Sequence, residues 1–221
     1  NAVAYNNLKP NTITFPTNRM VAGGSGGNPL AYSSDGIEWQ ASPGSNGITD
    51  ASSNVVAWNG TRWISGGSGT IIMAYSDDGG IDWTASIYDN DIFTDVNALA
   101  WNGTRWVAGG SGVNTIAYSD DNGITWTDSS SGTGTITSNV DVVVWNGTRW
   151  IAGGSGGNTI AYSDDGVSWT ASTNTIFSTA VYTLAWNGAR WVAGGEGTNT
   201  LAYSDDDGIT WTASTNGNVI F

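Results

Sequence analysis

Residues 101–126 read WNGTRWVAGGSGVNTIAYSDDNGITW, and the same phrase, with small changes, occurs five times along the 221-residue chain. A glycine pair marks each copy: Gly23-Gly24, Gly66-Gly67, Gly109-Gly110, Gly153-Gly154 and Gly194-Gly195. Successive pairs lie 43, 43, 44 and 41 residues apart. A period of this length is one supersecondary unit, so the sequence predicts a single domain built of stacked repeats.

Each copy predicts four short strands. In the third copy, residues 97–101 and 105–108 are apolar runs joined by Asn102-Gly103, a pair typical of a tight hairpin turn. The glycines that follow are expected to break the pattern, after which residues 115–118 and 124–127 form two further runs. No copy has the 3.6-residue periodicity of a helix. The fold class is therefore predicted to be all-β, with four antiparallel strands per repeat.

A four-stranded unit of this size cannot bury both faces alone, so neighbouring copies are expected to pack face to face. A closed ring would also cover the two end faces, which predicts a five-bladed β-propeller over residues 1–221. The blades are expected at about 1–43, 54–86, 97–129, 140–172 and 182–214. The first copy is the least regular, because residues 6–18 replace its hairpin turn, and the tail 218–221 is a candidate for helping the ring to close.

Every copy contains the pattern Ser-x-Asp, an optional residue, Gly, two residues and Trp. The third copy supplies Ser119, Asp121, Gly123 and Trp126. This pattern resembles the Asp-box of BNR repeats, which in that family lies in the hairpin between the third and fourth strands of a propeller blade. The resemblance predicts that the Asp caps its turn, the Gly takes a positive φ and the Trp fills the space beside the next blade. The residues concerned are Asp35, Asp78, Asp121, Asp165, Asp206, Trp39, Trp83, Trp126, Trp169 and Trp211.

Proteins that share the Asp-box include sialidases, sortilin-type receptors, photosystem assembly factors and several lectins. The blade number and repeat length also resemble tachylectin-type lectin propellers, which carry a sugar site in each repeat. The repeated sequences Trp-Asn-Gly-Thr-Arg-Trp and Tyr-Ser-Asp-Asp-Gly are similar in style to those of propeller modules in the surface proteins of large DNA viruses and phages. The Asp-box supports the fold and says little about activity, so function has to be argued from the site itself.

Catalysis is not expected. A sialidase needs three converging arginines and a Tyr/Glu pair, whereas here one arginine falls in each repeat and the only glutamates are Glu38 and Glu196. The absence of His and Cys excludes a His-based triad and an imidazole or thiolate metal site. The Asp pairs at 77-78, 120-121, 164-165 and 205-206 are candidates for calcium, but a turn cap plus a solvated charge is the favoured interpretation. We predict no enzyme activity, no metal and no cofactor.

The net charge limits the kinds of partner that the chain is expected to bind. Six Lys and Arg against nineteen Asp and Glu give a net charge of −13, which repels nucleic acid and anionic membranes. No apolar run reaches the roughly 18 residues needed to cross a bilayer. The first residue is not Met, which agrees with a segment of a larger polypeptide or assembly. An extracellular or particle-surface location is favoured.

The function predicted from these features is multivalent carbohydrate recognition through repeated shallow inter-blade sites. Aromatic rings pack on sugar faces, and five equivalent sites on one rigid body raise avidity on a dense surface. The candidate ligand-binding residues are Trp63, Trp106, Trp150, Trp191, Arg62, Arg105, Arg149 and Arg190. For these tryptophans a role in the core is the competing interpretation. The competing function is a structural or adhesion propeller that docks protein partners.

Overall fold

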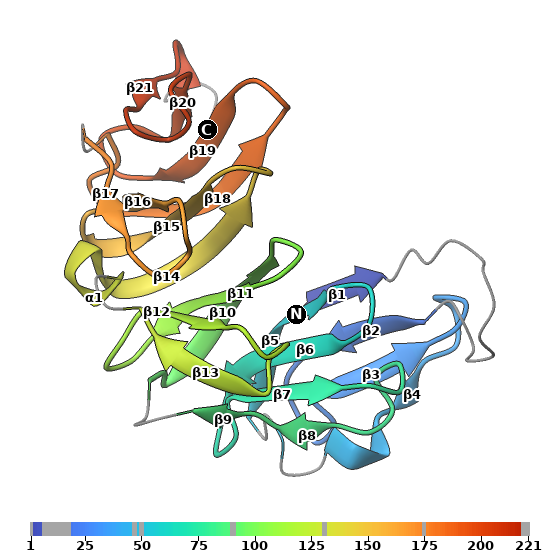
Figure 1. Cartoon of the computed structure of the whole chain (residues 1–221). Coiled ribbons are helices and arrows are strands. Elements are labelled where there is room, and N and C mark those ends of the chain that lie inside the picture. Colours follow the sequence, from blue (N-terminus) through green and yellow to red (C-terminus); the bar gives the residue numbers. More distant parts are fainter. Residues whose placement is uncertain are drawn as a thin grey trace.

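The computed structural model describes residues 2–5, 19–45, 48, 51–88, 92–129, 132–173 and 176–217, with the first of these segments given as backbone (Figure 1). The irregular segment 6–18 and the tail 218–221, which were expected to matter for the first copy and for closure, lie outside the described residues.

Antiparallel pairing repeats in five units of four strands. Unit 1 contains β1 (Ala2–Tyr5), β2 (Met20–Gly23), β3 (Leu30–Ser33) and β4 (Gln40–Ala41). Unit 2 contains β5 (Ser52–Trp58), β6 (Trp63–Ser68), β7 (Met73–Ser76) and β8 (Thr84–Ala85). Unit 3 contains β10 (Asp95–Trp101), β11 (Trp106–Ser111), β12 (Ile116–Ser119) and β13 (Thr125–Asp128). Unit 4 contains β14 (Ile136–Trp145), β15 (Trp150–Gly157), β16 (Ile160–Ser163) and β17 (Thr170–Ala171). Unit 5 contains β18 (Ala180–Trp186), β19 (Trp191–Glu196), β20 (Leu201–Ser204) and β21 (Thr212–Ala213).

Single pairs link some units, such as Asp95 with Ser68, so that the hydrogen-bonded sheets hold four, nine and eight strands. Strand β9 (Ile87–Tyr88) runs parallel to β13 of the next unit. In the described residues the helical turns are η1 (Pro43–Ser45) and α1 (Gly132–Thr135). The all-β prediction is confirmed, and the curled sheets succeed one another around an arc, from unit 1 in blue to unit 5 in red (Figure 1).

Apart from Gly24, which follows β2, the glycines of these pairs lie inside strands, which corrects the expectation that they break the pattern. Gly109 and Gly110 belong to β11. A Cβ on Gly109 would overlap the Val140 side chain of the next unit, and one on Gly110 would overlap the backbone oxygen of Asp95 at a bulge. The glycines are therefore needed because neighbouring strands approach too closely for any side chain.

The core consists of four clusters, each shared by two consecutive units. Between units 2 and 3, Ile64 and Met73 of the earlier unit pack with Trp106 and Trp126 of the later one. The Asp-box Trp of each later unit therefore packs against the preceding unit, and not beside the next one as predicted. The other three junctions repeat the arrangement.

The two end units do not share such a cluster in the described part of the chain. Trp39 of unit 1 is 39% exposed, whereas Trp83, Trp126, Trp169 and Trp211 are 1–6% exposed. Val192 of unit 5 is also 39% exposed, whereas its counterparts Val21, Ile64, Val107 and Ile151 are fully buried. Among the described residues, the expected covering of both end faces by ring closure is therefore not seen.

Candidate functional site

The Asp-box turns are held by their own side chains. In unit 3, Ser119 Oγ donates to Asp121 Oδ1 at 2.9 Å, and that oxygen also accepts the backbone N–H groups of Ile124 and Thr125 at 3.1 and 2.8 Å. Trp126 Nε1 donates to the carbonyl of Gly123 at 3.2 Å. Asp35, Asp78, Asp165 and Asp206 accept equivalent bonds in the other units. These carboxylates act on the turn and are not directed at a ligand.

The caps predict a loss of stability in acid. Burial raises the pKa of Asp121, but bonds from Thr125 and Ser119 outweigh it and hold the pKa below the usual 3.8. The pKa values of Asp35, Asp165 and Asp206 are also lowered. A depressed folded-state pKa stabilises the fold above the unfolded value of about 3.9, and this contribution disappears as pH falls through the folded-state pKa. Thermal unfolding from about pH 7 to 2 should show a steep decline below about pH 4. Asp121→Asn should reduce that decline, and an unchanged pH profile would contradict the assignment.

Each arginine lies on a tyrosine and, in units 2–5, pairs with an aspartate of its own unit. Arg62 stands 4.3 Å from the ring centre of Tyr75, and its Nε lies 2.6 Å from Asp77 Oδ1. The corresponding ion pairs are Arg105–Asp120, Arg149–Asp164 and Arg190–Asp205. The bond to Asp120 is the main cause that raises the pKa of Arg105. The first Asp of each pair thus neutralises an arginine and the second caps the turn.

The second-strand tryptophans do not present a face to solvent. Trp63, Trp106, Trp150 and Trp191 are all 0% exposed. Each packs against the first-strand Trp across the hairpin, with ring centres 5.0–5.2 Å apart. Their predicted direct contact with a ligand is therefore wrong, because these rings are already enclosed by the neighbouring unit.

Two of these buried indoles lack a hydrogen-bond partner. Trp191 Nε1 donates to Asp207 Oδ1 at 3.1 Å and Trp106 Nε1 to Asn122 Oδ1 at 3.4 Å, whereas the Nε1 atoms of Trp63 and Trp150 have none. The difference arises in the Asp-box, where unit 2 has Gly79 at the place of Asn122 and unit 4 has no residue there.

Gly79→Asn is expected to stabilise the protein by about 1 kcal/mol, by giving Trp63 Nε1 an acceptor. Gly79 has φ +83°, and Asn122 already adopts φ 66° at the equivalent place, so the backbone suits Asn. Arg19 Cδ would lie 2.8 Å from the new Cβ and must shift slightly. Urea unfolding measures the effect. Gly79→Ala adds the Cβ without the amide, so equal stability of the two variants would refute the explanation.

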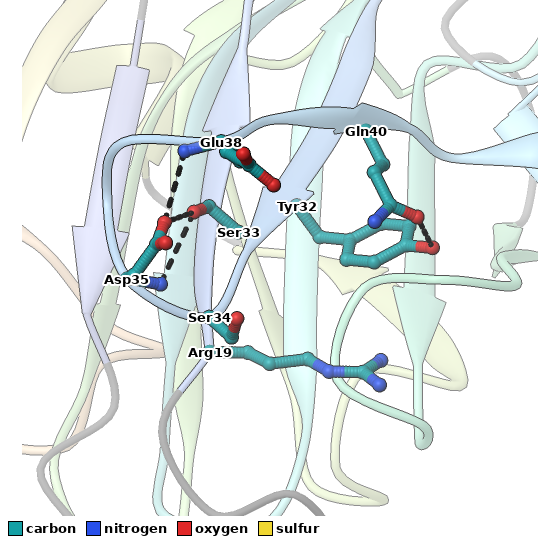
Figure 2. A pocket seen from close by; sticks show the side chains of 7 residues that line it. All are labelled: Arg19, Tyr32, Ser33, Ser34, Asp35, Glu38 and Gln40. Atoms are coloured by element: carbon teal, nitrogen blue, oxygen red, sulfur yellow. Dashed lines mark hydrogen bonds between the residues drawn. The ribbon is translucent and has the colours of Figure 1, made fainter.

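Unit 1 departs from this pattern and contains a polar hollow. Ser34 stands where the other units carry the arginine-pairing aspartate. A cavity of about 270 Å³ lies there, lined by Arg19, Tyr32, Ser33, Ser34, Asp35, Glu38 and Gln40 (Figure 2). We call this cavity the unit 1 hollow. Sequence reasoning missed it, although the Ser34 exception in an otherwise repeated Asp was visible.

The walls of the unit 1 hollow are held in place by local bonds. Tyr32 Oη donates to Gln40 Oε1 at 2.8 Å, and Arg19 stands 5.1 Å from the Tyr32 ring centre while donating to the carbonyl of Asp78 at 3.0 Å. Backbone N–H groups of Glu38 and Ile37 and the Ser33 hydroxyl hold the pKa of Asp35 below its usual value. In Figure 2, Glu38 and Gln40 lie on the segment that leads into β4, and Ser34 and Arg19 lie at the opposite edge of the cavity.

Two segments match a family model, the BNR/Asp-box repeat, at residues 117–128 and 202–213. The matched segments run from the third strand through the turn to the fourth strand in units 3 and 5. None of the curated proteins matches this chain.

Solved structures with a similar fold include a computationally designed protein called Ika8, with TM-score 0.64 and 15% identity over 98% of this chain. The GH74 enzyme of Niastella koreensis has TM-score 0.63 and 20% identity over 97%, and an ancestral GH74 enzyme has 0.62 and 16% over 96%. This chain spans 61% of the designed protein and 31% of each GH74 enzyme. With the BNR repeats and the curled sheets, these likenesses show a propeller-like fold.

Neither a metal-ligand cluster nor a membrane-spanning helix occurs in the residues that the structure describes. No group of three or more His, Cys, Asp or Glu side chains in this part of the chain is arranged to hold a metal ion. Within the same residues, no helix has the length and apolar character needed to cross a membrane.

Proposed function

We propose that the chain is a non-enzymatic binding module with five propeller blades, one per unit, that recognises carbohydrate through shallow polar sites beside the Asp-boxes. The observation that supports this most is the unit 1 hollow, where an aromatic ring, a guanidinium and several hydroxyl and carboxylate oxygens line one cavity (Figure 2). Its volume is near the lower end of ligand sites, about 300 Å³, and suits a monosaccharide-sized group.

The chemistry of the unit 1 hollow matches a sugar. Hydroxyls of a sugar both donate and accept, so they pair with the carboxylate of Glu38 and the guanidinium of Arg19. The Tyr32 ring offers an apolar surface for the C–H face. Units 2–5 repeat the arginine and tyrosine, but there the arginine is paired with Asp77, Asp120, Asp164 or Asp205. We therefore expect unit 1 to bind most tightly and the arginines Arg62, Arg105, Arg149 and Arg190 to form weaker repeated sites that add avidity.

The carboxylates of the unit 1 hollow favour binding over hydrolysis. A glycosidase needs one carboxylic acid with a raised pKa and a second carboxylate as base or nucleophile. Asp35 accepts three bonds within its own turn and has a lowered pKa, which suits neither the acid role nor free attack on a substrate. Only Glu38 is left. Assays with aryl glycosides and polysaccharides should give no turnover, and activity abolished by Glu38→Gln would contradict this proposal.

A glycan array with the purified protein, followed by calorimetry on any hit, tests the ligand class. Tyr32→Ala should remove the tightest site, whereas Tyr75→Ala removes the same ring in unit 2, where the Arg62–Asp77 pair covers it, and should leave the tight site intact. A blank array on folded protein, or equal losses from both variants, would refute the unit 1 hollow as the main site.

The second candidate is a structural or adhesion module that docks protein partners on an extracellular or particle surface, within a larger polypeptide or assembly. The observation that favours it is the exposure of apolar side chains on the two end faces, such as Trp39 and Val192. Neither nucleic acid nor a membrane is expected as partner, because the net charge is −13.

A further inference from the structure

One interface joins every unit to the next. An apolar side chain from the second strand of the earlier unit enters the space left by the Asp-box glycine of the later unit. Thus a Cβ on Gly123 would overlap Ile64 Cδ1, and one on Gly166 would lie 3.0 Å from Val107 Cγ2. Gly80 faces Val21 and Gly208 faces Ile151 in the same manner. The glycine is required at each junction because the neighbour's side chain occupies its Cβ position.

Polar groups accompany the apolar contact. The serine after the fourth strand donates to the carbonyl of the same glycine, as in Ser86 Oγ to Gly123 O at 2.7 Å and Ser172 Oγ to Gly208 O at 2.6 Å. The residue that follows bonds through its backbone, as in Thr173 N to Ile209 O at 2.9 Å. Thr173 also forms a parallel bridge with Thr210. Each junction is therefore specified by several matched pairs.

The end units carry the two unmatched halves of this interface. Unit 5 has the apolar side chain Val192, then Ser214 and Thr215 at the donor positions, and Val192 is 39% exposed. Unit 1 has the receiving glycine, Gly36, followed by Ile37, which is 82% exposed. A Cβ on Gly36 would meet Met20 of its own unit, and among the described residues no side chain of another unit lies within 4 Å of it.

The two unmatched halves of the interface also carry charges of opposite sign. At the internal junctions the arginine Nη1 donates to an Asp-box carbonyl of the next unit, as from Arg62 to Asn122 at 3.1 Å. The Arg190 side chain is 49% exposed, against 13–23% for Arg62, Arg105 and Arg149. On the receiving side, unit 1 presents the carboxylates of Asp35 and Glu38, both exposed.

We propose that unit 5 of one copy binds unit 1 of a second copy, head to tail, through this same interface. Units 1 and 5 lie at opposite ends of the arc in Figure 1, so joining them within one chain requires sharper curvature at four junctions that are already tightly packed. A second copy requires no such change. The contact is heterologous, so it gives a closed ring of copies if the rotation closes and an open chain of copies if it does not.

Engineered cysteines test the register, since the chain has no native Cys. By equivalence with the Thr173–Thr210 bridge, Thr215 should face Glu38 of the other copy. Bridged strands lie about 4.8 Å apart, within the range for a disulfide. The experiment mixes Thr215→Cys protein with Glu38→Cys protein under mild oxidation at about 0.15 M salt, which screens the repulsion between acidic copies. A mixed disulfide dimer should dominate over either homodimer.

The double variant Thr173→Cys/Thr210→Cys is the control, because it should crosslink within one chain. Light scattering should show masses of at least twice 22.9 kDa that grow with concentration. Val192→Asp should shift the midpoint of association about tenfold or more to higher concentration. A mass of 22.9 kDa at every concentration would overturn the proposal. An intramolecular disulfide in the double variant Thr215→Cys/Glu38→Cys would also overturn it, and would show instead that the ring closes within one chain. Glycan binding is read separately, so either idea can fail alone.

Discussion

Trp126→Ala is expected to lower the free energy of unfolding by about 3–5 kcal/mol, the usual cost of removing a buried Trp. Trp126 is 1% exposed and packs with Ile64 and Met73 of the preceding unit. Its loss leaves a cavity at a junction and removes the indole N–H that donates to the carbonyl of Gly123. Urea unfolding gives the difference, provided that the slope with denaturant is unchanged.

The matched control is Trp39→Ala, at the same position in unit 1. Trp39 keeps the bond to its own glycine carbonyl but has no preceding unit in the arc and is 39% exposed. At concentrations too low for association, its replacement should cost roughly half as much or less. Equal costs for the two variants would mean that the end face of unit 1 is covered in the isolated chain, which contradicts the open arc.

Gly123→Ala is expected to destabilise the protein by about 2–5 kcal/mol, for two separable reasons. The residue has φ +85°, which costs a non-glycine residue about 1–2 kcal/mol. The new Cβ would also overlap Ile64 Cδ1 across the junction, and overpacking costs about 1–3 kcal/mol. Gly103→Ala isolates the first cost, since Gly103 has φ +103° and nothing lies within 4 Å of its Cβ position.

A double-mutant cycle with Ile64→Val tests the second cost. This substitution removes the methyl group that the new Cβ would strike, as in the junction where Val107 naturally faces Gly166. The double variant Gly123→Ala/Ile64→Val should therefore be more stable than the sum of the two single effects predicts, with a coupling free energy of about 1–2 kcal/mol. Additive effects would show that Ile64 does not occupy the space beside Gly123.

The strand arrangement could be predicted from sequence because its determinants are local. Asn102-Gly103 marks the hairpin turn, in which the Asn102 side chain accepts the backbone N–H groups of Thr104 and Arg105, and Trp101 pairs with Trp106 across it. The Ser119–Asp121 turn is equally local. The role of Gly109 could not be predicted in this way, since a glycine that breaks a strand and one that admits Val140 of the next unit have the same local sequence.

The candidate site was harder to predict, because exposure depends on neighbours that are distant in sequence. Trp106 was a reasonable ligand contact beside an Asn-Gly turn, yet the adjacent units bury it completely. The pairing of Arg62 with Asp77 requires knowledge that the two turns share one edge of the unit. Once that pairing is known, Ser34 stands out as the position where the pairing aspartate is missing.

The central functional claim, that the unit 1 hollow binds carbohydrate, is tested most directly by calorimetric titration of Ser34→Asp with a glycan selected on the array. The new carboxylate should pair with Arg19 as Asp77 pairs with Arg62, fill the unit 1 hollow and weaken the tight site about 100-fold or more, with the fold intact. Asp77→Ser should do the reverse and add a second tight site in unit 2. Unchanged binding by Ser34→Asp would contradict the claim.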